Sequence, residues 1–453
     1  MESDDTTLLP TPYERPWERS ELAASRSALR DLRPGDLRVG VLGDGLAALA
    51  SAHYLARAGI EPVVLASSSI GGWLAERFPV GPHRFDCFHM PISRSDSALC
   101  GLLAELDLLP RVAWRATELA LYACDVPRLI RSWSDLREVR RAQRTQLRRW
   151  RGWTAPSGAR TGSSEPAGCC HTDLFEGWWH RGLRAESCVL CESEGSRISR
   201  AQLRQMDLGA ERVIGYLRGG HRTLLDALAT SISLRGGQLL RGIRLLGLEA
   251  DAHGAMAEWD TDSAHFDALL STLPLPTLTK LGRGPLVRSL PFSAGSPRIE
   301  ISVVVQLERP LALPYLTLPF GSRARFQKIY NAGPLLPEEE RGGLLPVYLV
   351  REAELNSERS RCSDEDLIAD AFDFLRSPGV GFDPGAVAAV QVFRAPDLDL
   401  TWDREPLQRP PSRRLGETCA YLCTPARPFP RSRTPETSVI LARDTASQIA
   451  YQI

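Results

Sequence analysis

The stretch from Leu37 to Ala66 reads LRVGVLGDGLAALASAHYLARAGIEPVVLA. It begins with a short apolar run that is typical of a buried parallel strand. After the glycines, leucines and alanines recur with helical spacing as far as Gly59, where a helix stop is expected. IEPVVLA then predicts a second strand. Because two parallel strands need a crossover, this order of elements indicates a βαβ unit and an α/β fold.

The turn between strand and helix carries the sharpest chemical signal. Residues 43–48 read GDGLAA, a G-x-G-x-x-A pattern. Gly43 allows the tight turn, Gly45 lets the backbone approach a pyrophosphate, and Ala48 lets helix and strand pack closely. The helix amino terminus adds free N–H groups and the positive end of a dipole. The pattern therefore predicts a dinucleotide site, with a glycine turn in an unrelated α/β domain as the alternative.

The second strand ends without the acid that dinucleotide folds normally carry about 20 residues beyond the turn, where it binds the ribose hydroxyls. Ala66 stands at that position, and Ser67 follows it. Two hydrogen bonds to a charged acceptor would contribute about 1.5–3 kcal/mol each. Since Ser67 offers at most a weaker contact, we expect the cofactor to be held loosely.

The rest of the chain divides into contrasting stretches. Residues 1–36 form a polar extension, with a short helix expected over 21–32. Residues 128–204 are rich in Arg, Trp, Ser and Gly and contain a predicted flexible loop. Regular patterning then returns, with a helix over 221–237, short strands to 274, strands of a second sheet over 301–320, and helices over 363–376 and 435–453.

Composition limits the kinds of partner. The formal net charge is zero, which gives no overall attraction to nucleic acid or to an anionic membrane. No apolar run reaches about 18 residues, so no integral membrane contact is expected. The acidic amino terminus does not fit a signal peptide, and ten scattered cysteines favour reduced thiols, so we expect a cytoplasmic protein. Lys280 and Lys328 are the only lysines, which leaves two candidates for any catalytic lysine.

Three further groups of residues have ordinary explanations. Residues 169–171 (CCH), with Cys188 and Cys191, lie close enough in sequence to bind zinc. The first group is adjacent rather than spaced, so unliganded thiols are favoured and no metal site is predicted. The tryptophans at 178–179 fit either an apolar substrate pocket or the core. Arginines over 137–151 predict a solvated helix face, with attraction of an anionic substrate or membrane as the alternative.

Several ordered segments extend the signal of the glycine turn. SSSIGGWLAERF is followed by HRFDCFHM and SRSDSALCGLLAELDLL, and later by GYLRGGHRTLLDALATSISLRGGQLLRGIRLLGLEAD and FDALLSTLPLPTLTKL. Together they resemble the superfamily of FAD-dependent amine oxidases, protoporphyrinogen oxidases and phytoene desaturases. The resemblance covers residues 37–110 and 213–290, with a weaker match over 415–453.

The resemblance implies where the cofactor, FAD, would lie. In that superfamily the paired glycines, here Gly71 and Gly72, pass close to the flavin. By alignment, Leu245 would offer its backbone to the adenine, and Thr272 would end a strand near the flavin. His89 follows the FD turn at which the superfamily approaches the flavin. It is therefore the candidate catalytic residue, with a simply hydrogen-bonded histidine as the alternative.

The carboxy-terminal segment differs from that of many superfamily members, which end with a Gly-Asp pair whose acid meets the flavin ribityl phosphate chain. The matching region, CAYLCTPARPFPRSRTPETSVILARDTA, has no such pair. It is more similar to a branch described only as FAD-dependent oxidoreductases, in which a proline, two acids and an arginine precede the helix. Pro430 and Arg433 match that pattern, whereas Arg431 and Ser432 stand where the acids would be. Arg433 is thus implied as a cofactor-binding residue.

These observations predict an α/β fold with a discontinuous Rossmann-like FAD-binding domain over residues 37–110, 205–290 and 415–453. A mixed-sheet α+β substrate domain would be inserted over 111–204 and 291–414. The resemblance implies an FAD-dependent oxidoreductase that takes a hydride from a C–N or C–C bond of a small or apolar substrate. The alternatives are a non-redox flavin enzyme resembling UDP-galactopyranose mutase, and a non-catalytic relative that acts as a binding or scaffold protein.

Overall fold

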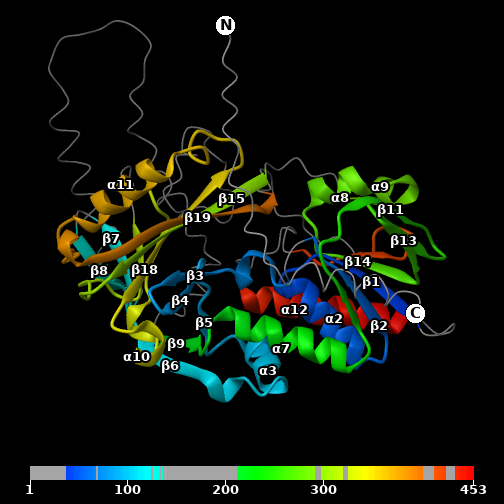
Figure 1. Ribbon diagram of the computed structural model, residues 1–453, viewed down its shortest axis with the longest axis horizontal. Helices are drawn as coiled ribbons and strands as arrows, with labels where there is room; N and C mark the ends of the chain where they lie inside the picture. The colour runs from blue at the N-terminus through cyan, green and yellow to red at the C-terminus, as the bar shows by residue number, and fades with distance from the viewer. Residues whose placement is uncertain are drawn as a thin grey trace, which may run out of the picture.

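The computed structural model describes residues 37–67, 70–123, 126–132, 134–135, 138, 212–290, 297–319, 325–400, 413–424 and 434–452. Within these ranges the chain forms two parts that lie side by side (Figure 1). One part is built on a five-stranded parallel sheet, and the other on a seven-stranded mixed sheet. The predicted α/β class, with a Rossmann-like part and a mixed-sheet part, is confirmed.

The five-stranded sheet contains the strand that precedes the glycine turn. Its strands are all parallel and lie in the order β10-β2-β1-β14-β20. Their bounds are Arg38–Leu42 (β1), Glu61–Leu65 (β2), Gln238–Leu240 (β10), Ala268–Ser271 (β14) and Ala420–Leu422 (β20). The three central strands are buried along nearly their whole length. Continuous apolar runs such as VVL are expected of strands that are covered on both faces.

Helices cover one face of this sheet and a β-meander covers the other (Figure 1). The helices are α2 (Leu46–Arg57), α7 (His221–Leu234) and α12 (Pro435–Gln452), with α3 (Ser97–Glu105) packed against α12. The meander consists of β11 (Leu245–Ala250), β12 (Ala255–Trp259) and β13 (Asp262–Phe266), next to α8 (Leu275–Leu281) and α9 (Gly284–Ser289). Buried side chains from all of these elements form one core.

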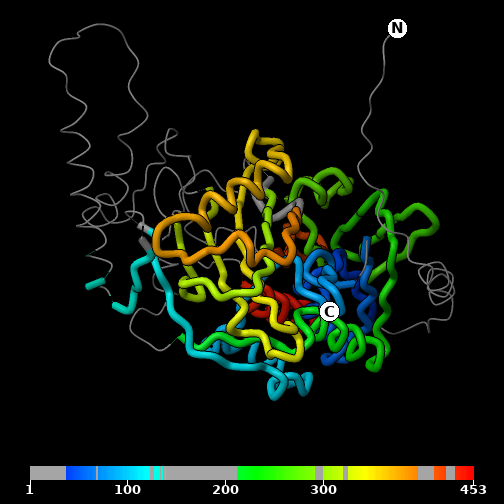
Figure 2. The backbone as a smooth tube through the Cα atoms, turned by 60° about the vertical axis from the view of Figure 1, so that its left-hand side comes forward, coloured from blue at the N-terminus to red at the C-terminus, as the bar shows by residue number. Residues whose placement is uncertain are grey.

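The carboxy-terminal helix closes this part of the molecule. In Figure 2 the red α12 lies against blue amino-terminal segments, and α12 packs along α2. Its Glu436 reaches α3, where the backbone N–H groups of Ala98 and Leu99 donate to the two carboxylate oxygens at 3.0 and 2.7 Å. These N–H groups belong to the first turn of α3 and have no partner within that helix. A side chain more than 330 residues away therefore caps α3.

The seven-stranded sheet runs in the order β19-β15-β18-β17-β16-β7-β8. Its strands are Leu119–Ala123 (β7), Val126–Leu129 (β8), Pro297–Leu307 (β15), Leu316–Pro319 (β16), Lys328–Asn331 (β17), Leu345–Glu354 (β18) and Val387–Leu400 (β19). Only β16 and β7 pair in parallel. Helix α11 (Asp364–Leu375) covers one face, and Ser363 caps it by accepting from the Asp366 N–H at 3.1 Å. The opposite face carries an aromatic core.

Several smaller elements complete the described structure. They are β3 (Arg77–Val80) and β4 (His83–Asp86), which form a hairpin, β5 (Ile92–Ser93), β6 (Val112–Thr117) and β9 (Arg212–Leu217), which form a sheet, α10 (Glu338–Arg341), and the 3-10 turns η1 (Gly72–Ala75), η2 (Leu109–Arg111), η4 (Gly333–Leu335) and η5 (Pro384–Ala386). The sheet β5-β9-β6 spans the domain boundary expected at residue 110, and the expected boundaries stay a prediction.

The expected helices and strands within the described ranges are confirmed, including α2, α7, α11 and α12. The amino-terminal extension, the zinc candidates, the tryptophan pair, most of the arginine-rich stretch and residues 430–433 lie outside the described residues. Among the helices that the structure describes, none is long and apolar enough to span a lipid bilayer.

Candidate functional site

The first glycine turn is tightly built around Gly43, which follows β1. Its φ of +127° is in the region that favours glycine, and a Cβ there would lie 2.1 Å from Thr272 Oγ1. Thr272 donates this hydroxyl to the Leu42 carbonyl at 2.9 Å, and the Gly43 N–H donates to the Leu65 carbonyl at 3.2 Å. The turn is thus held by the ends of β1, β2 and β14, and any side chain at position 43 would break it.

Gly45 differs from Gly43 because its surroundings are open. It caps the amino terminus of α2 with extended backbone (φ −80°, ψ −176°), and no side chain caps the helix there. Apart from the two adjoining residues, no atom lies within 4 Å of the position that a Cβ would take. Ala48 is fully buried and lies 3.7 Å from the corresponding position on Gly43, so a small residue lets the helix approach the strand. Helix α2 therefore begins at an open position and has no side-chain cap for its first N–H groups.

The end of β2 presents little polar surface. Ala66 is fully buried; its N–H donates to the Leu240 carbonyl and its carbonyl accepts from the Ile243 N–H, both at 2.9 Å. Ser67 is exposed and donates its hydroxyl to Asp44 Oδ2 at 3.3 Å. The contact with Ile243 brings the start of β11, where Leu245 lies at a β-bulge, toward this end of the sheet. The roles expected of Ala66 and Leu245 stay predictions.

The second glycine pair lies directly beside the first turn. Gly71 and Gly72 have φ of +98° and +53°. The Gly71 N–H donates to the Asp44 carbonyl at 2.7 Å, and a Cβ on Gly71 would lie 2.6 Å from Leu225 of α7. A Cβ on Gly72 would lie 2.8 Å from Asp44 Oδ1. Two turns that are separated in the sequence by α2 and β2 therefore form one glycine-lined loop cluster around Asp44.

His89 belongs to a different group, the aromatic cluster of His89, Tyr315, Tyr330 and Tyr348. His89 Nε2 and the Tyr315 hydroxyl lie 2.8 Å apart, and the imidazole stacks on Tyr348 with ring centres 5.0 Å apart. The Tyr330 ring centre is also 5.0 Å away. Burial lowers the pKa of His89 to about 3, so the imidazole is neutral at pH 7. Its catalytic assignment stays a prediction.

A charged pair lies next to the aromatic cluster. Lys328 precedes Tyr330 by two residues on β17, so both side chains lie on the same face of the sheet. Its ammonium lies 3.2 Å from Glu352 Oε1, and this attraction raises the pKa of Lys328. The Lys328 side chain is 34% exposed.

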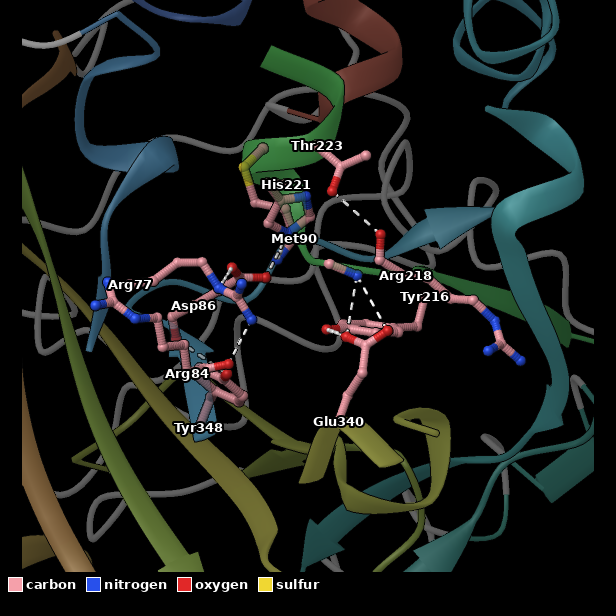
Figure 3. A network of polar contacts seen from close by, with 11 residues as sticks. Arg77, Arg84, Asp86, Met90, Tyr216, Arg218, His221, Thr223, Glu340 and Tyr348 are labelled. Atoms are coloured by element: carbon pink, nitrogen blue, oxygen red, sulfur yellow. Dashed lines mark hydrogen bonds and ion pairs between the residues drawn. The ribbon is translucent and has the colours of Figure 1, made fainter. Parts of the chain in front are cut away.

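Figure 3 shows the polar network that connects the two parts of the molecule. Asp86 of β4 is almost fully buried, and the Arg77 Nε lies 3.2 Å from its Oδ1. The Tyr348 hydroxyl donates to the Asp86 carbonyl at 3.0 Å. A Cβ on Gly220 would lie 2.4 Å from Asp86 Oδ1, so only glycine permits α7 to begin here. Burial raises the pKa of Asp86 and lowers that of the adjacent His221.

Glu340 of α10 makes the second connection in Figure 3. Its carboxylate accepts from the Gly219 N–H at 3.0 and 3.1 Å and from the Tyr216 hydroxyl at 2.8 Å. The turn before α7 is therefore held from both sides, by Asp86 and by Glu340. This arrangement sets the position of α7, whose Leu225 packs against Gly71.

The structure thus separates the expected site residues into two groups. Gly43, Gly45, Ser67, Gly71, Gly72 and Thr272 gather around one loop cluster, with Ala66 and Leu245 behind it. His89 lies in the aromatic cluster, and Arg433 is outside the described residues. Sequence reasoning missed Asp44, although the glycine pattern contains it. It also missed the three tyrosines, which carry no shared motif: Tyr315 directly precedes β16, Tyr330 lies in β17 and Tyr348 in β18.

Comparison with known proteins agrees with this geometry. The family model described as flavin containing amine oxidoreductase matches residues 46–296, more than half of the chain. The chain belongs to that family. The flavin-containing amine oxidoreductases are oxidoreductases, so membership implies a flavin cofactor and an oxidation reaction in general terms. A comparison with curated proteins gave no match.

Several solved structures share the fold of this chain, although their sequences are only distantly similar to it. An oxidoreductase from Methanosarcina mazei is 16% identical, with a TM-score of 0.61 over 90% of this chain and 99% of the other. The cyclohexylamine oxidase from Brevibacterium oxydans is 13% identical, with a TM-score of 0.58 over 92% and 99%. A putrescine oxidase variant is 12% identical, with a TM-score of 0.59 over 92% and 100%. At these identities the likeness establishes the fold alone.

The residues of the loop cluster fit the dinucleotide half of such a cofactor. The open space at Gly45 is a cradle that a Cβ would fill, and it lies at the uncapped amino terminus of α2. Backbone N–H groups and the helix dipole are the donors that a pyrophosphate requires. The ribose-binding acid of the usual pattern is replaced by the buried Ala66.

Proposed function

We propose that the protein binds FAD without a covalent link and uses it to oxidise a small or apolar substrate, taking a hydride from a C–N or C–C bond. The observation that carries the proposal is Gly45, which faces open space at the amino terminus of α2 within a chain of the amine oxidoreductase family. A pyrophosphate bound there would accept from the first N–H groups of the helix. FAD would supply the hydride acceptor when bound, and the protein would bind and orient the substrate.

The cysteines of the carboxy-terminal segment favour non-covalent binding. Cys419 and Cys423 are both buried. Burial raises the pKa of Cys419 to about 11, so its thiolate is scarce at neutral pH. Since the thiolate is the nucleophilic form, a thioether link through this residue is disfavoured. Acid precipitation should therefore release the flavin into the supernatant.

The aromatic cluster supports a small or apolar substrate. Burial raises the pKa values of Tyr315, Tyr330 and Tyr348, so their hydroxyls remain protonated donors at neutral pH. The neutral His89 orients Tyr315, and Lys328 keeps its charge beside Glu352. These groups combine an apolar wall with a few fixed polar atoms, which is the usual composition of a small-molecule site.

The test is anaerobic reduction of the bound flavin. The purified protein, reconstituted with FAD if needed, is mixed with primary amines, secondary amines and apolar substrates that have an activated C–C bond. We expect one class to remove the visible absorption of oxidised flavin, and that class identifies the bond. The Gly45→Val variant, mixed with the same compounds, is the control for reaction outside the site.

Other outcomes would assign a different function. Interconversion of UDP-galactopyranose without net flavin reduction would indicate the non-redox alternative. A protein that takes up no FAD on reconstitution would contradict the proposal and leave a binding or scaffold role.

A further inference from the structure

A carboxylate lies inside the loop cluster at a position that the glycine pattern leaves unspecified. Asp44 stands between Gly43 and Gly45. Its Oδ2 accepts from the Ser67 hydroxyl at 3.3 Å, and its Oδ1 lies 2.8 Å from the place where Gly72 would carry a Cβ. The Asp44 carboxylate therefore sits between the end of β2 and the second glycine pair.

The end of β2 has no acid of its own. Ala66 buries its methyl group completely and uses its N–H and carbonyl in bonds to Leu240 and Ile243. In dinucleotide-binding folds this strand end holds the carboxylate that accepts from the ribose hydroxyls. Here the carboxylate that reaches the strand end comes from Asp44, through its contact with Ser67.

An acid in a phosphate-binding turn would repel the pyrophosphate if it pointed toward it. The Asp44 side chain instead turns toward Ser67 and Gly72, because its Oδ2 accepts from the Ser67 hydroxyl and its Oδ1 lies beside the Cβ position of Gly72. A carboxylate has about four lone-pair sites, so Asp44 can accept from ribose hydroxyls in addition to the protein groups that it already contacts.

We propose that Asp44, oriented by Ser67, supplies the carboxylate that binds the ribose hydroxyls of the adenosine half of FAD, in place of the acid absent at Ala66. This inference rests on the proposed function, because it assumes that the loop cluster holds FAD. It changes the expectation of loose binding: the acceptor is present, but it comes from the glycine turn rather than from the strand.

The test measures ribose recognition apart from catalysis. Apoprotein is titrated calorimetrically with FAD, ADP, 2′-deoxy-ADP and 3′-deoxy-ADP. We expect the wild type to bind ADP roughly tenfold or more tightly than at least one deoxy analogue, because a hydrogen bond to a charged acceptor is lost. The Asp44→Ala variant should bind ADP and FAD more weakly by a similar factor and should lose that discrimination.

Three further variants sharpen the test. Ser67→Ala should weaken ribose discrimination less than Asp44→Ala, because it removes only the orienting bond. Adding Ala66→Glu to Asp44→Ala should restore the discrimination. Asp260→Ala, which removes an exposed acid from the turn between β12 and β13, should leave every affinity unchanged and controls for net charge.

The outcomes separate this inference from the proposed function. If the wild type binds FAD but Asp44→Ala keeps the same ribose discrimination, the inference alone is overturned. If Asp44→Ala binds ADP more tightly, the carboxylate opposes the phosphates and the inference is again overturned. If the wild type binds neither FAD nor ADP, the proposed function fails as well.

Discussion

His89 shows how its surroundings decide what a residue can do. In sequence it follows a turn that approaches the flavin in the superfamily, whereas in the structure its Nε2 is 2.8 Å from the Tyr315 hydroxyl and its ring stacks on Tyr348. A pKa lowered to about 3 makes the imidazole a weak base at neutral pH. These contacts favour the structural alternative that the sequence left open.

The depressed pKa of His89 predicts a specific pH dependence of stability. The unfolded state takes up this proton near pH 6.5, whereas the folded state resists it down to about pH 3. Because the unfolded state binds more protons in that window, the free energy of unfolding falls as pH drops from 6.5 toward 3, by up to about 1.4 kcal/mol per pH unit. Urea unfolding of the wild type and of His89→Gln, followed at several pH values, measures the difference.

The glutamine variant is a matched control because it can still hydrogen-bond Tyr315 but does not titrate. Its unfolding free energy should fall less steeply over the same window. Parallel pH profiles for the two proteins would contradict the assignment of a neutral, half-buried His89.

At the scale of elements, the amino terminus of α2 is the feature on which cofactor binding depends. Gly45→Val places a side chain in the open space at that terminus, where no residue other than its two chain neighbours comes within 4 Å of the new Cβ, and the backbone conformation suits any residue. We therefore expect the variant to fold normally and to retain no FAD. Flavin content per chain and far-UV circular dichroism measure the two properties.

Two other glycines provide the comparison. Gly101 of α3 is exposed and also has no atom within 4 Å of its Cβ position, so Gly101→Val should keep its flavin. Gly43→Ala should lose folded structure as well as flavin, because its φ is +127° and the new Cβ meets Thr272 Oγ1. A folded Gly45→Val protein that keeps its flavin would refute the proposal that the pyrophosphate binds at Gly45.

At the scale of the whole molecule, short polar contacts tie the two sheets together. Glu340, from α10 beside the seven-stranded sheet, accepts bonds from Gly219 and Tyr216 at the turn before α7. Glu340→Ala would leave a half-buried N–H and a hydroxyl without this charged partner. We expect the free energy of unfolding to fall by about 1.5–3 kcal/mol. Chemical denaturation measures it.

The neighbouring Glu339 serves as the control, because it forms an exposed ion pair with Arg218 at 2.7 Å. Exposed pairs contribute little, so Glu339→Ala should leave stability almost unchanged. If both variants lost the same free energy of unfolding, Glu340 would contribute through its negative charge alone and not through its hydrogen bonds to the turn before α7.

Local patterns in the sequence determined the βαβ unit, the glycine turn, helices α7, α11 and α12, and the α/β class. Strand and helix periodicity, and the demand of a tight turn for glycine, operate over a few residues and can be read without tertiary information. The expected glycine turn between a strand and a helix, with Gly43, Gly45 and Ala48, is confirmed for the same reason.

Only the tertiary structure decided which distant residues meet. Glu436 caps α3, the tyrosines surround His89, and Asp44 turns toward Ser67 and Gly72 because packing of whole elements brings these segments together. No local pattern predicts such contacts, since each depends on strand order and on how helices lie on a sheet. The chemistry of the site therefore follows from packing, while the fold that carries it follows from short-range sequence signals.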